Sequence, residues 1–320
     1  MKLTSIITFF TLFLNGNESL SVNSNYMDKY NEFTEKYSKD FSASNFLIFK
    51  NNMKYIESFK DDLYEVEMNH LMDHSMLPNH LIKKRKNMIF ENPYDDFVYD
   101  DIPESVNWVE KDIVTRVKDQ GQCGSCYAFS ATGSIEGIHA LKTNQIRNIS
   151  EQEVVDCSGM EGNQGCFGGY MHDVYQYVID NNGICSEQDY PYHADQNQCN
   201  TSCHQVVKIS SYKNVTQNNE TSLMRAVAQQ PVSVAIQANL PSFQFYSKGI
   251  YNDSQCSGEL DHGVLVVGYG NDDNNVSYWL IKNSWGPNWG ENGYIKMLRN
   301  LPNSSIGMCG IAMEPTFPLI

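Results

Sequence analysis

The octet Gln120-Gly121-Gln122-Cys123-Gly124-Ser125-Cys126-Tyr127 says most about this 320-residue chain. The pattern predicts a helix that begins near Cys126 and runs to about Lys142, so the Cys126 thiol would lie at a helix N-terminus. Unpaired backbone N–H groups and the helix dipole favour an anion there, which lowers the pKa of a thiol and makes its thiolate available as a nucleophile. Zinc binding is the alternative, but no second CxxC or HxxxH follows at zinc-finger spacing.

Two downstream segments supply partners for such a thiol. Residues 260–270 read LDHGVLVVGYG, and residues 283–290 read NSWGPNWG. His262 precedes an apolar strand, and Asn283 ends a neighbouring one, where its side chain can accept from the imidazole and fix its tautomer. Trp285 would shield that hydrogen bond from water. Four other histidines are interpreted as structural: His139, His172, His193 and His204.

The composition is that of a globular protein with a large core, at 41% hydrophobic and 19% charged residues. A formal net charge of -15 argues against nucleic acid and anionic membranes as partners. The charge suits an acidic compartment, although it is equally explained by solubility alone.

The N-terminus has the pattern of a signal peptide, residues 1–17. Lys2 is followed by an apolar run to Leu14 and then by polar residues. The run is too short for a membrane span, and no other run reaches the roughly 18 residues required. A buried helix is the alternative. The nine cysteines all follow residue 101, and an odd count in a secreted chain leaves one reactive thiol or one intermolecular bridge.

The chain divides into two parts that differ in amino-acid composition. Residues 20–100 lack cysteine and predict helices over about 26–37 and 43–59, the second with an apolar stripe at helical spacing. An acidic linker at 91–104 is a candidate cleavage segment, and the basic run Lys83–Lys86 is interpreted as a solvated face.

In the later part of the chain, the sequence pattern predicts helices first and strands second. A capping box at Ser150 begins one helix, and another covers about 170–181. This order indicates an α+β fold whose halves leave a cleft. The expected strands are Val232–Ile236, His262–Tyr269, Tyr278–Lys282 and Gly293–Leu298.

Several motifs together resemble the papain family of cysteine peptidases, and its cathepsin L-like branch most of all. They are QGQCGSC, SEQEVVDC, GCFGG, DHGVLVVGYG and NSWGPNWGENGY. The resemblance covers nearly the whole chain, as a preproenzyme. It implies a papain-like two-lobed α+β fold, with a helical N-terminal lobe and an antiparallel β-barrel-like C-terminal lobe, preceded by a helical propeptide. The implied segments are a signal peptide (1–17), an inhibitory propeptide (18–101) and a peptidase domain (102–320).

The resemblance also implies roles for single residues. Cys126 is the nucleophile, His262 the general base and acid, and Asn283 the residue that orients it. Gln120 and the backbone N–H of Cys126 form the oxyanion hole, and the reaction is acyl transfer through a thioester, without cofactor or metal. No insertion blocks the cleft, which favours an endopeptidase; a transpeptidase, an exopeptidase and a catalytically silent binding module are the alternatives.

Nine further positions are implied to bind substrate. Gly168 and Gly169 would pair with extended substrate backbone, and Phe167 beside them would narrow the approach. The pocket for the second residue before the scissile bond would be apolar, with Glu314 at its floor admitting arginine as well. The full set is Gly168, Gly169, Tyr170, Met171, Ala235, Leu260, Asp261, Trp285 and Glu314.

The cysteines pair by the same resemblance. The family pairs are Cys123–Cys166, Cys157–Cys199 and Cys256–Cys309, and Cys185–Cys203 matches an additional bridge of some protozoan members. Cys126 would then stay unpaired. Seven N-x-[ST] sequons permit glycosylation of a secreted chain: Asn148, Asn200, Asn214, Asn219, Asn252, Asn275 and Asn303.

The propeptide match is imperfect. Phe41, Asn45 and Lys60 stand where the long-helix motif has Glu, Arg and Asn, so an ion-pair framework is missing, and Leu71 replaces the Phe of the second motif, residues 68–73. The implied partners are protein and peptide substrates, the chain's own propeptide and cystatin-like inhibitors. The protein would be a monomer in the secretory pathway, in a lysosome or digestive vacuole, or secreted.

Overall fold

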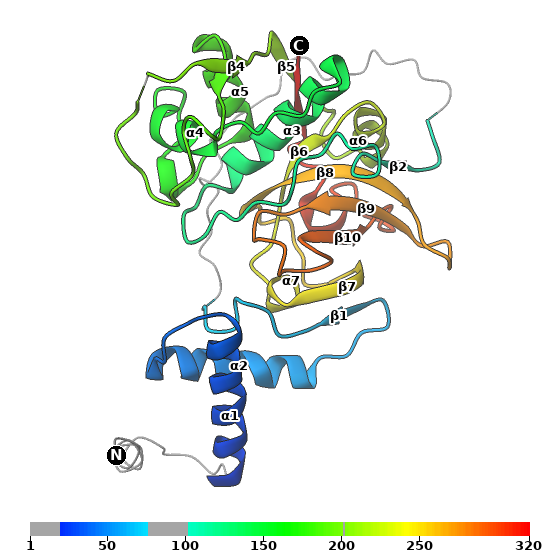
Figure 1. Cartoon of the computed structure of the whole chain (residues 1–320). Helices are drawn as coiled ribbons and strands as arrows, with labels where there is room; N and C mark the ends of the chain where they lie inside the picture. The colour runs from blue at the N-terminus through cyan, green and yellow to red at the C-terminus, as the bar shows by residue number, and fades with distance from the viewer. Residues whose placement is uncertain (1–19, 76–101, 201) are drawn as a thin grey trace.

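The computed structural model describes residues 20–75, 102–200 and 202–320. The expected signal peptide, the basic run at 83–86 and most of the acidic linker lie outside these residues. Within them, no helix has both the length and the apolar character needed to cross a bilayer. The described parts form a helical lobe, a sheet lobe and, on the far side of the sheet lobe, the prosegment (residues 20–75; Figure 1).

The prosegment consists of two crossing helices and one short strand (Figure 1). Helix α1 spans Leu20–Lys36, helix α2 spans Ala43–Ser58, and strand β1 spans Tyr64–Val66. The predicted apolar stripe of α2 is buried against α1, where the rings of Tyr30 and Phe33 each lie 5.1 Å from that of Phe49. Helix α1 begins six residues earlier than expected, because residues 20–25 (LSVNSN) contain only two apolar residues and show no helical apolar period.

The helical lobe is built around α3 (Cys126–Thr143), which is buried on nearly all sides. Small residues permit this: a Cβ on Gly133 would lie 2.8 Å from the Leu265 side chain, and one on Gly137 would lie 2.7 Å from Pro231. The lobe also contains α4 (Glu151–Cys157) and α5 (Met171–Asp180). The predicted capping box is present, since Ser150 Oγ accepts from the backbone N–H of Glu153 at 2.9 Å.

The sheet lobe is centred on the long strand β8, which is flanked by β6 and β9. The strand order is β1-β7-β10-β9-β8-β6-β11-β5, with β2 paired to β8. All pairs are antiparallel except β7 with β10, and the sheet stays open, with β1 and β5 at its edges, where a barrel-like form was expected. The bounds are β2 Val106–Asn107, β5 Ser211–Asn214, β6 Val232–Ile236, β7 Tyr246–Tyr251, β8 His262–Asn271, β9 Ser277–Lys282, β10 Tyr294–Leu298 and β11 Thr316–Leu319.

Smaller elements complete the fold. Strands β3 (Ile184–Cys185) and β4 (Gln205–Val207) form a separate two-stranded sheet, and the short helices are α6 (Glu220–Val227) and α7 (Pro241–Gln244). The four disulfides join the same pairs that the resemblance implies: Cys123–Cys166, Cys157–Cys199, Cys185–Cys203 and Cys256–Cys309.

The prosegment packs on the sheet lobe and extends it. Strand β1 pairs antiparallel with β7, and the rings of Tyr64 and Tyr251 lie 5.0 Å apart. The buried residues of α1 and α2 form one continuous core with those of the sheet. Because this core is shared, the prosegment is docked by apolar burial as well as by strand pairing.

Candidate active site

Cys126 is the first residue of α3 and lies where the two lobes meet. It is buried and, among the described residues, it is the one cysteine outside a disulfide. The start of β8 backs directly onto it, since a Cβ on Gly263 would lie 3.3 Å from the Cys126 carbonyl oxygen and 3.3 Å from Tyr127 Cα. Strand β8 therefore brings His262, the residue before Gly263, to the N-terminus of α3.

The thiol is not activated by the helix terminus alone. Burial raises the pKa of Cys126 to about 12, and hydrogen bonds from the backbone of Gly263 and Tyr127 only partly offset this. The sequence led us to expect a lowered pKa from the helix N-terminus, but the cost of burying a thiolate is larger. A thiol in this position needs a cationic partner to ionise.

His262 is held by Asn283 under an aromatic lid. Its Nε2 lies 2.7 Å from Asn283 Oδ1, and both residues are buried. Asn283 follows β9, and its Oδ1 also accepts from the backbone N–H of Ser284 at 2.8 Å. The Trp285 ring lies 4.8 Å from the imidazole at an interplanar angle of 30°. The structure thus brings together the His, Asn and Trp singled out from the sequence.

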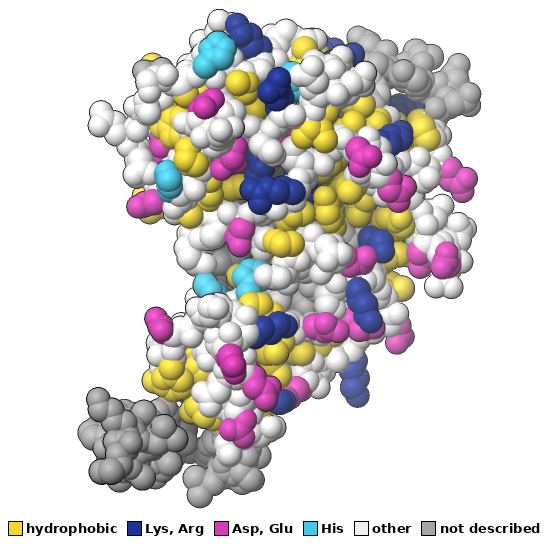
Figure 2. Space-filling model, viewed as in Figure 1, with side chains coloured by type: hydrophobic (Ala, Val, Ile, Leu, Met, Phe, Trp, Pro, Cys, Tyr) yellow, Lys and Arg dark blue, Asp and Glu magenta, His cyan; other side chains and the backbone are white. Residues whose placement is uncertain are grey.

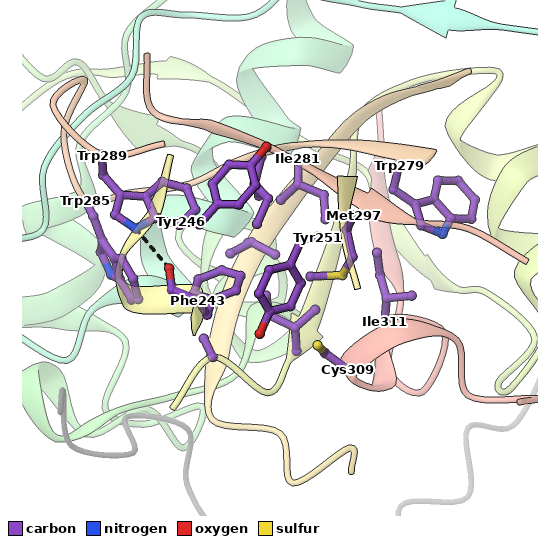
Figure 3. Packing of buried hydrophobic residues seen from close by; sticks show 14 of the residues in the cluster. Phe243, Tyr246, Tyr251, Trp279, Ile281, Trp285, Trp289, Met297, Cys309 and Ile311 are labelled. Atoms are coloured by element: carbon purple, nitrogen blue, oxygen red, sulfur yellow. Dashed lines mark hydrogen bonds between the residues drawn. The ribbon is translucent and has the colours of Figure 1, made fainter. Parts of the chain in front are cut away.

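The lid is part of a larger aromatic cluster that the sequence did not reveal in full (Figure 3). Phe243, from α7, packs edge-on against Trp285 at 5.5 Å and lies 5.2 Å from Trp289. It also approaches His262, at 6.4 Å. Trp289 Nε1 donates to the Phe243 carbonyl oxygen at 3.2 Å. The two tryptophans were visible in the motif, whereas Phe243 lies 40 residues upstream of it without any local signal.

Gln120 is fixed at both ends of its amide. Its Oε1 accepts from Ser284 Oγ at 2.7 Å, its Nε2 donates to the Cys123 carbonyl oxygen at 2.9 Å, and its backbone N–H donates to the Ser284 carbonyl oxygen at 2.8 Å. The amide nitrogen therefore points to the loop that carries Cys126. A primary amide nitrogen has two hydrogens, so one remains for a further acceptor. Ser284 is a supporting residue that the sequence reading missed.

The glycine strip consists of two positions that disfavour any larger residue, Gly168 and Gly169. Gly168 has φ 109°, and a Cβ on Gly169 would lie 2.2 Å from Asn163 Oδ1, which accepts from the Tyr170 backbone N–H at 2.8 Å. These positions therefore need glycine. Phe167 is 81% exposed, so it projects from the strip into solvent.

The expected pocket residues come from both lobes. Met171, from α5, and Ala235, from β6, are buried in one apolar cluster, and Leu260 packs against that cluster. Glu314 is half-buried and follows Met313, whose sulfur would lie 2.9 Å from a Cβ on Gly310. The same Cβ would lie 2.8 Å from Leu260 Cδ2, so Met313 lies close to one of the residues expected to line the pocket.

Asp261 is buried beside this group. Its Oδ1 accepts from the Ala238 backbone N–H at 2.7 Å, and burial raises the pKa of its carboxyl to about 6. Its charge disfavours a thiolate at Cys126.

Among the described residues, one group of side chains has metal-ligand spacing: Glu153, Cys185 and Cys203. The two sulfurs are joined in a disulfide, so they offer no thiolate to a metal ion.

The prosegment reaches this site through the loop that follows β1. Asn69 Nδ2 donates to the Gln244 carbonyl oxygen at 2.8 Å, and Asn52 Nδ2 donates to the Met72 carbonyl oxygen at 2.9 Å. Lys39 forms an ion pair with Asp73, and Asn45 Nδ2 donates to Asp73 at 3.4 Å. The missing motif residues are thus partly replaced. Figure 2 shows histidine side chains where the prosegment meets the lobes.

The comparisons with known proteins agree with this geometry. Residues 102–319 match the family model described as papain family cysteine protease. Vignain of Phaseolus vulgaris is 42% identical over 291 residues, which cover 86% of this chain and 79% of vignain. The senescence-specific cysteine protease SAG39 of Oryza sativa subsp. japonica is 41% identical over 285 residues, covering 86% and 84%.

Solved precursors of cysteine proteases superpose on this chain. The proform of the ragweed pollen cysteine protease Amb a 11 superposes with a TM-score of 0.85 at 36% identity, covering 96% of this chain and 98% of its own. Digestive procathepsin L 3 of Tenebrio molitor larval midgut superposes with a TM-score of 0.82 at 37% identity, covering 95% and 100%.

Proposed function

Because this chain belongs to the papain family of cysteine proteases, we propose that Cys126, His262, Asn283 and Gln120 are its catalytic residues. The chain is a cysteine endopeptidase, and the solved proforms of its relatives support an inactive precursor. The observation that carries the assignment is the 2.7 Å bond between His262 and Asn283, covered by Trp285 at the N-terminus of the helix that begins with Cys126.

The geometry supports the following sequence of steps. With Nε2 committed to Asn283, His262 takes the thiol proton through Nδ1, and the resulting ion pair offsets the cost of the buried thiolate. The thiolate sulfur attacks the peptide carbonyl carbon, and the oxyanion accepts from Gln120 Nε2 and the Cys126 backbone N–H. His262 then protonates the leaving amine as the C–N bond breaks, which leaves a thioester. Water, deprotonated by His262, hydrolyses the thioester and restores Cys126.

The prosegment explains the inactive state. We assign residues 1–17 to a signal peptide, 18–101 to an inhibitory propeptide and 102–320 to the peptidase domain. The shared core and the β1–β7 pairing would hold the propeptide until it is cleaved. The apolar run after Lys2 supports entry into the secretory pathway, towards a lysosome, a digestive vacuole or the exterior. Cystatin-like inhibitors and a monomeric state are further parts of this proposal.

Substrate choice is assigned to the pocket around Met171, Ala235 and Leu260, which is apolar and would take Leu, Val or Phe. Glu314 at its edge would also accept arginine when ionised. In a Glu314→Ala enzyme we expect cleavage after Arg-Arg to fall relative to cleavage after Phe-Arg, whereas Glu110→Ala, an exposed carboxylate elsewhere, leaves the ratio unchanged. An unchanged ratio in Glu314→Ala would remove this assignment.

The test of the endopeptidase function is product analysis. The full precursor is incubated at about pH 5 and given a long peptide blocked at both ends, and the products are identified by mass spectrometry. We expect internal cleavage, absent in Cys126→Ser. Products trimmed stepwise from an unblocked peptide, with the blocked peptide intact, would show an exopeptidase instead.

A further inference from the structure

A small cavity lies between the two lobes, behind Asn283. Its volume is about 20 Å³, which is room for a single water molecule. Lys118, Glu136 and Glu151 line it on the side of the helical lobe, and Lys282, Asn283 and Ser284 line it on the side of the sheet lobe. The proposed catalytic amide thus forms part of the wall of a cavity whose lining includes four charged side chains.

The charges in this wall are buried and mostly paired. Lys118 Nζ lies 2.6 Å from Glu151 Oε1 and 2.9 Å from Glu136 Oε1. Thr132 Oγ1 also donates to Glu151 Oε1, at 2.6 Å, so this oxygen has two donors. Burial raises the pKa of Glu151 to about 7. Burying this charged cluster therefore costs free energy unless its remaining polar atoms also have hydrogen-bond partners.

Two atoms of the wall lack a hydrogen-bond partner among the described residues. They are Glu151 Oε2, an acceptor, and Asn283 Nδ2, a donor. Both side chains are almost fully buried, at 1% and 3% exposure. One atom is an acceptor and the other a donor, and the two residues come from opposite lobes. The cavity that both residues line has room for one water molecule, which can accept from the amide and donate to the carboxylate.

We propose that one buried water accepts from Asn283 Nδ2 and donates to Glu151 Oε2, and that Glu151 is thereby a positioning residue for the catalytic Asn283. This inference rests on the proposed role of Asn283. An asparagine amide can turn by half a rotation and exchange its oxygen and nitrogen. A turned Asn283 would present N–H groups to His262 Nε2, so the imidazole would lose its acceptor. In the orientation that the structure shows, Asn283 Oδ1 accepts from the Ser284 backbone N–H, and a water anchored by Glu151 gives Asn283 Nδ2 the acceptor that it otherwise lacks.

The isosteric variant Glu151→Gln tests this. In the glutamine, Oε1 stays with Lys118 and the amide nitrogen faces the cavity, so an acceptor becomes a donor. The kinetics are measured at about pH 8, where Glu151 with its pKa of about 7 is ionised. There we expect kcat to fall roughly tenfold, the scale of one lost buried hydrogen-bond partner, with KM changed less than about twofold. Glu153→Gln is the matched control: it is buried on the same helix but bonds to Tyr177 and Cys185 instead, and we expect its kcat to be unchanged.

A double-mutant cycle separates positioning from a structural role. If Glu151 acts through Asn283, Glu151→Gln makes no further difference to kcat in an Asn283→Ala background. Independent, additive losses would overturn the inference while leaving the catalytic assignment in place. Full activity of Asn283→Ala would overturn the catalytic assignment itself.

A high-resolution crystal structure of the unaltered precursor provides a second test, which does not depend on how the variants fold. We expect one water within hydrogen-bond distance of both Asn283 Nδ2 and Glu151 Oε2. A dry cavity, or a water that contacts only one of the two atoms, would contradict the proposal.

Discussion

Acid should loosen the prosegment through His74. His74 Nε2 lies 3.3 Å from Lys39 Nζ and 3.4 Å from Asp73 Oδ1, and its side chain is hydrogen-bonded to Gln122, two residues after the proposed oxyanion-hole residue Gln120. His70, also half-buried, lies near Asp119 in the loop that carries Gln122. At neutral pH the uncharged His74 ring can accept from Lys39. A protonated ring would instead place two positive charges side by side.

The direction of the effect follows from the pKa shift. Burial lowers the pKa of His74, the Lys39 ammonium lowers it further, and Asp73 and Gln122 oppose the change. The docked prosegment therefore binds fewer protons than the released one. Docking keeps its full strength above about pH 6.5, the ordinary value for histidine, and weakens as the pH falls from there towards the lowered pKa.

The magnitude follows from the charges and the burial around His74. Two unit charges 3.3 Å apart, as in Lys39 and a protonated His74, repel by about 1.3 kcal/mol in bulk water and by about 5 kcal/mol at a dielectric constant of about 20. Asp73 Oδ1, 3.4 Å from the same nitrogen, attracts a protonated ring by nearly as much, so burial of the ring supplies most of the net cost. A difference of one pKa unit between the docked and released states corresponds to about 1.4 kcal/mol, or a tenfold change in the docking equilibrium.

The perturbation is His74→Gln, which keeps a polar side chain but cannot become charged. The assay is the initial rate at which a thiol-directed epoxide labels Cys126 in the full precursor, measured over a series of pH values. We expect equal rates at about pH 7.5 and roughly tenfold slower labelling of the variant at about pH 5. His193→Gln, an exposed histidine on the helical lobe, is the control. Identical pH profiles for wild type and His74→Gln would show that protonation of His74 does not loosen the prosegment.

Three further substitutions test separate parts of the account. Trp285→Ala uncovers the imidazole–amide hydrogen bond to water, and we expect kcat to fall by about 5- to 100-fold with a smaller change in KM, as steady-state kinetics would show. Gly169→Ala places a Cβ 2.2 Å from Asn163 Oδ1, so we expect a loss of about 1–3 kcal/mol in stability and a raised KM for peptides; unchanged values would mean that the strip is not rigid. Ser150→Ala removes the hydroxyl that caps α4 at Glu153, and denaturant unfolding should show a loss of about 1 kcal/mol without a change in kcat.

The sequence was most informative where apolar residues repeat with a clear period. The predicted second helix and the strand at Val232–Ile236 agree with α2 and β6 to within one residue. The short strands β1, β5 and β11 were not predicted, because their positions are set by pairing with distant segments. The parallel β7–β10 pair and the open sheet likewise depend on tertiary contacts.

The candidate active site likewise contains residues that the sequence identified and residues that it did not. The motifs identify the residues with the chemical roles, because Cys126, His262 and Asn283 each stand in a distinctive local pattern. Phe243, Ser284 and the cavity behind Asn283 had no such pattern, since each depends on which segments meet in space. The pKa of the Cys126 thiol was expected to fall, and burial raises it, because desolvation cannot be read from local sequence.

The central claim is that a buried thiol becomes a nucleophile through His262. It is tested by the pH dependence of Cys126 alkylation by a small reagent, in wild type and His262→Ala, after an added serine protease has removed the prosegment from both. For wild type we expect alkylation already at about pH 5–6, far below the range of an ordinary thiol. For His262→Ala we expect alkylation only well above about pH 8.5, the ordinary value for a thiol, because burial raises the pKa of Cys126. Wild-type alkylation that follows the profile of an ordinary thiol, or a His262→Ala profile that matches wild type, would contradict it.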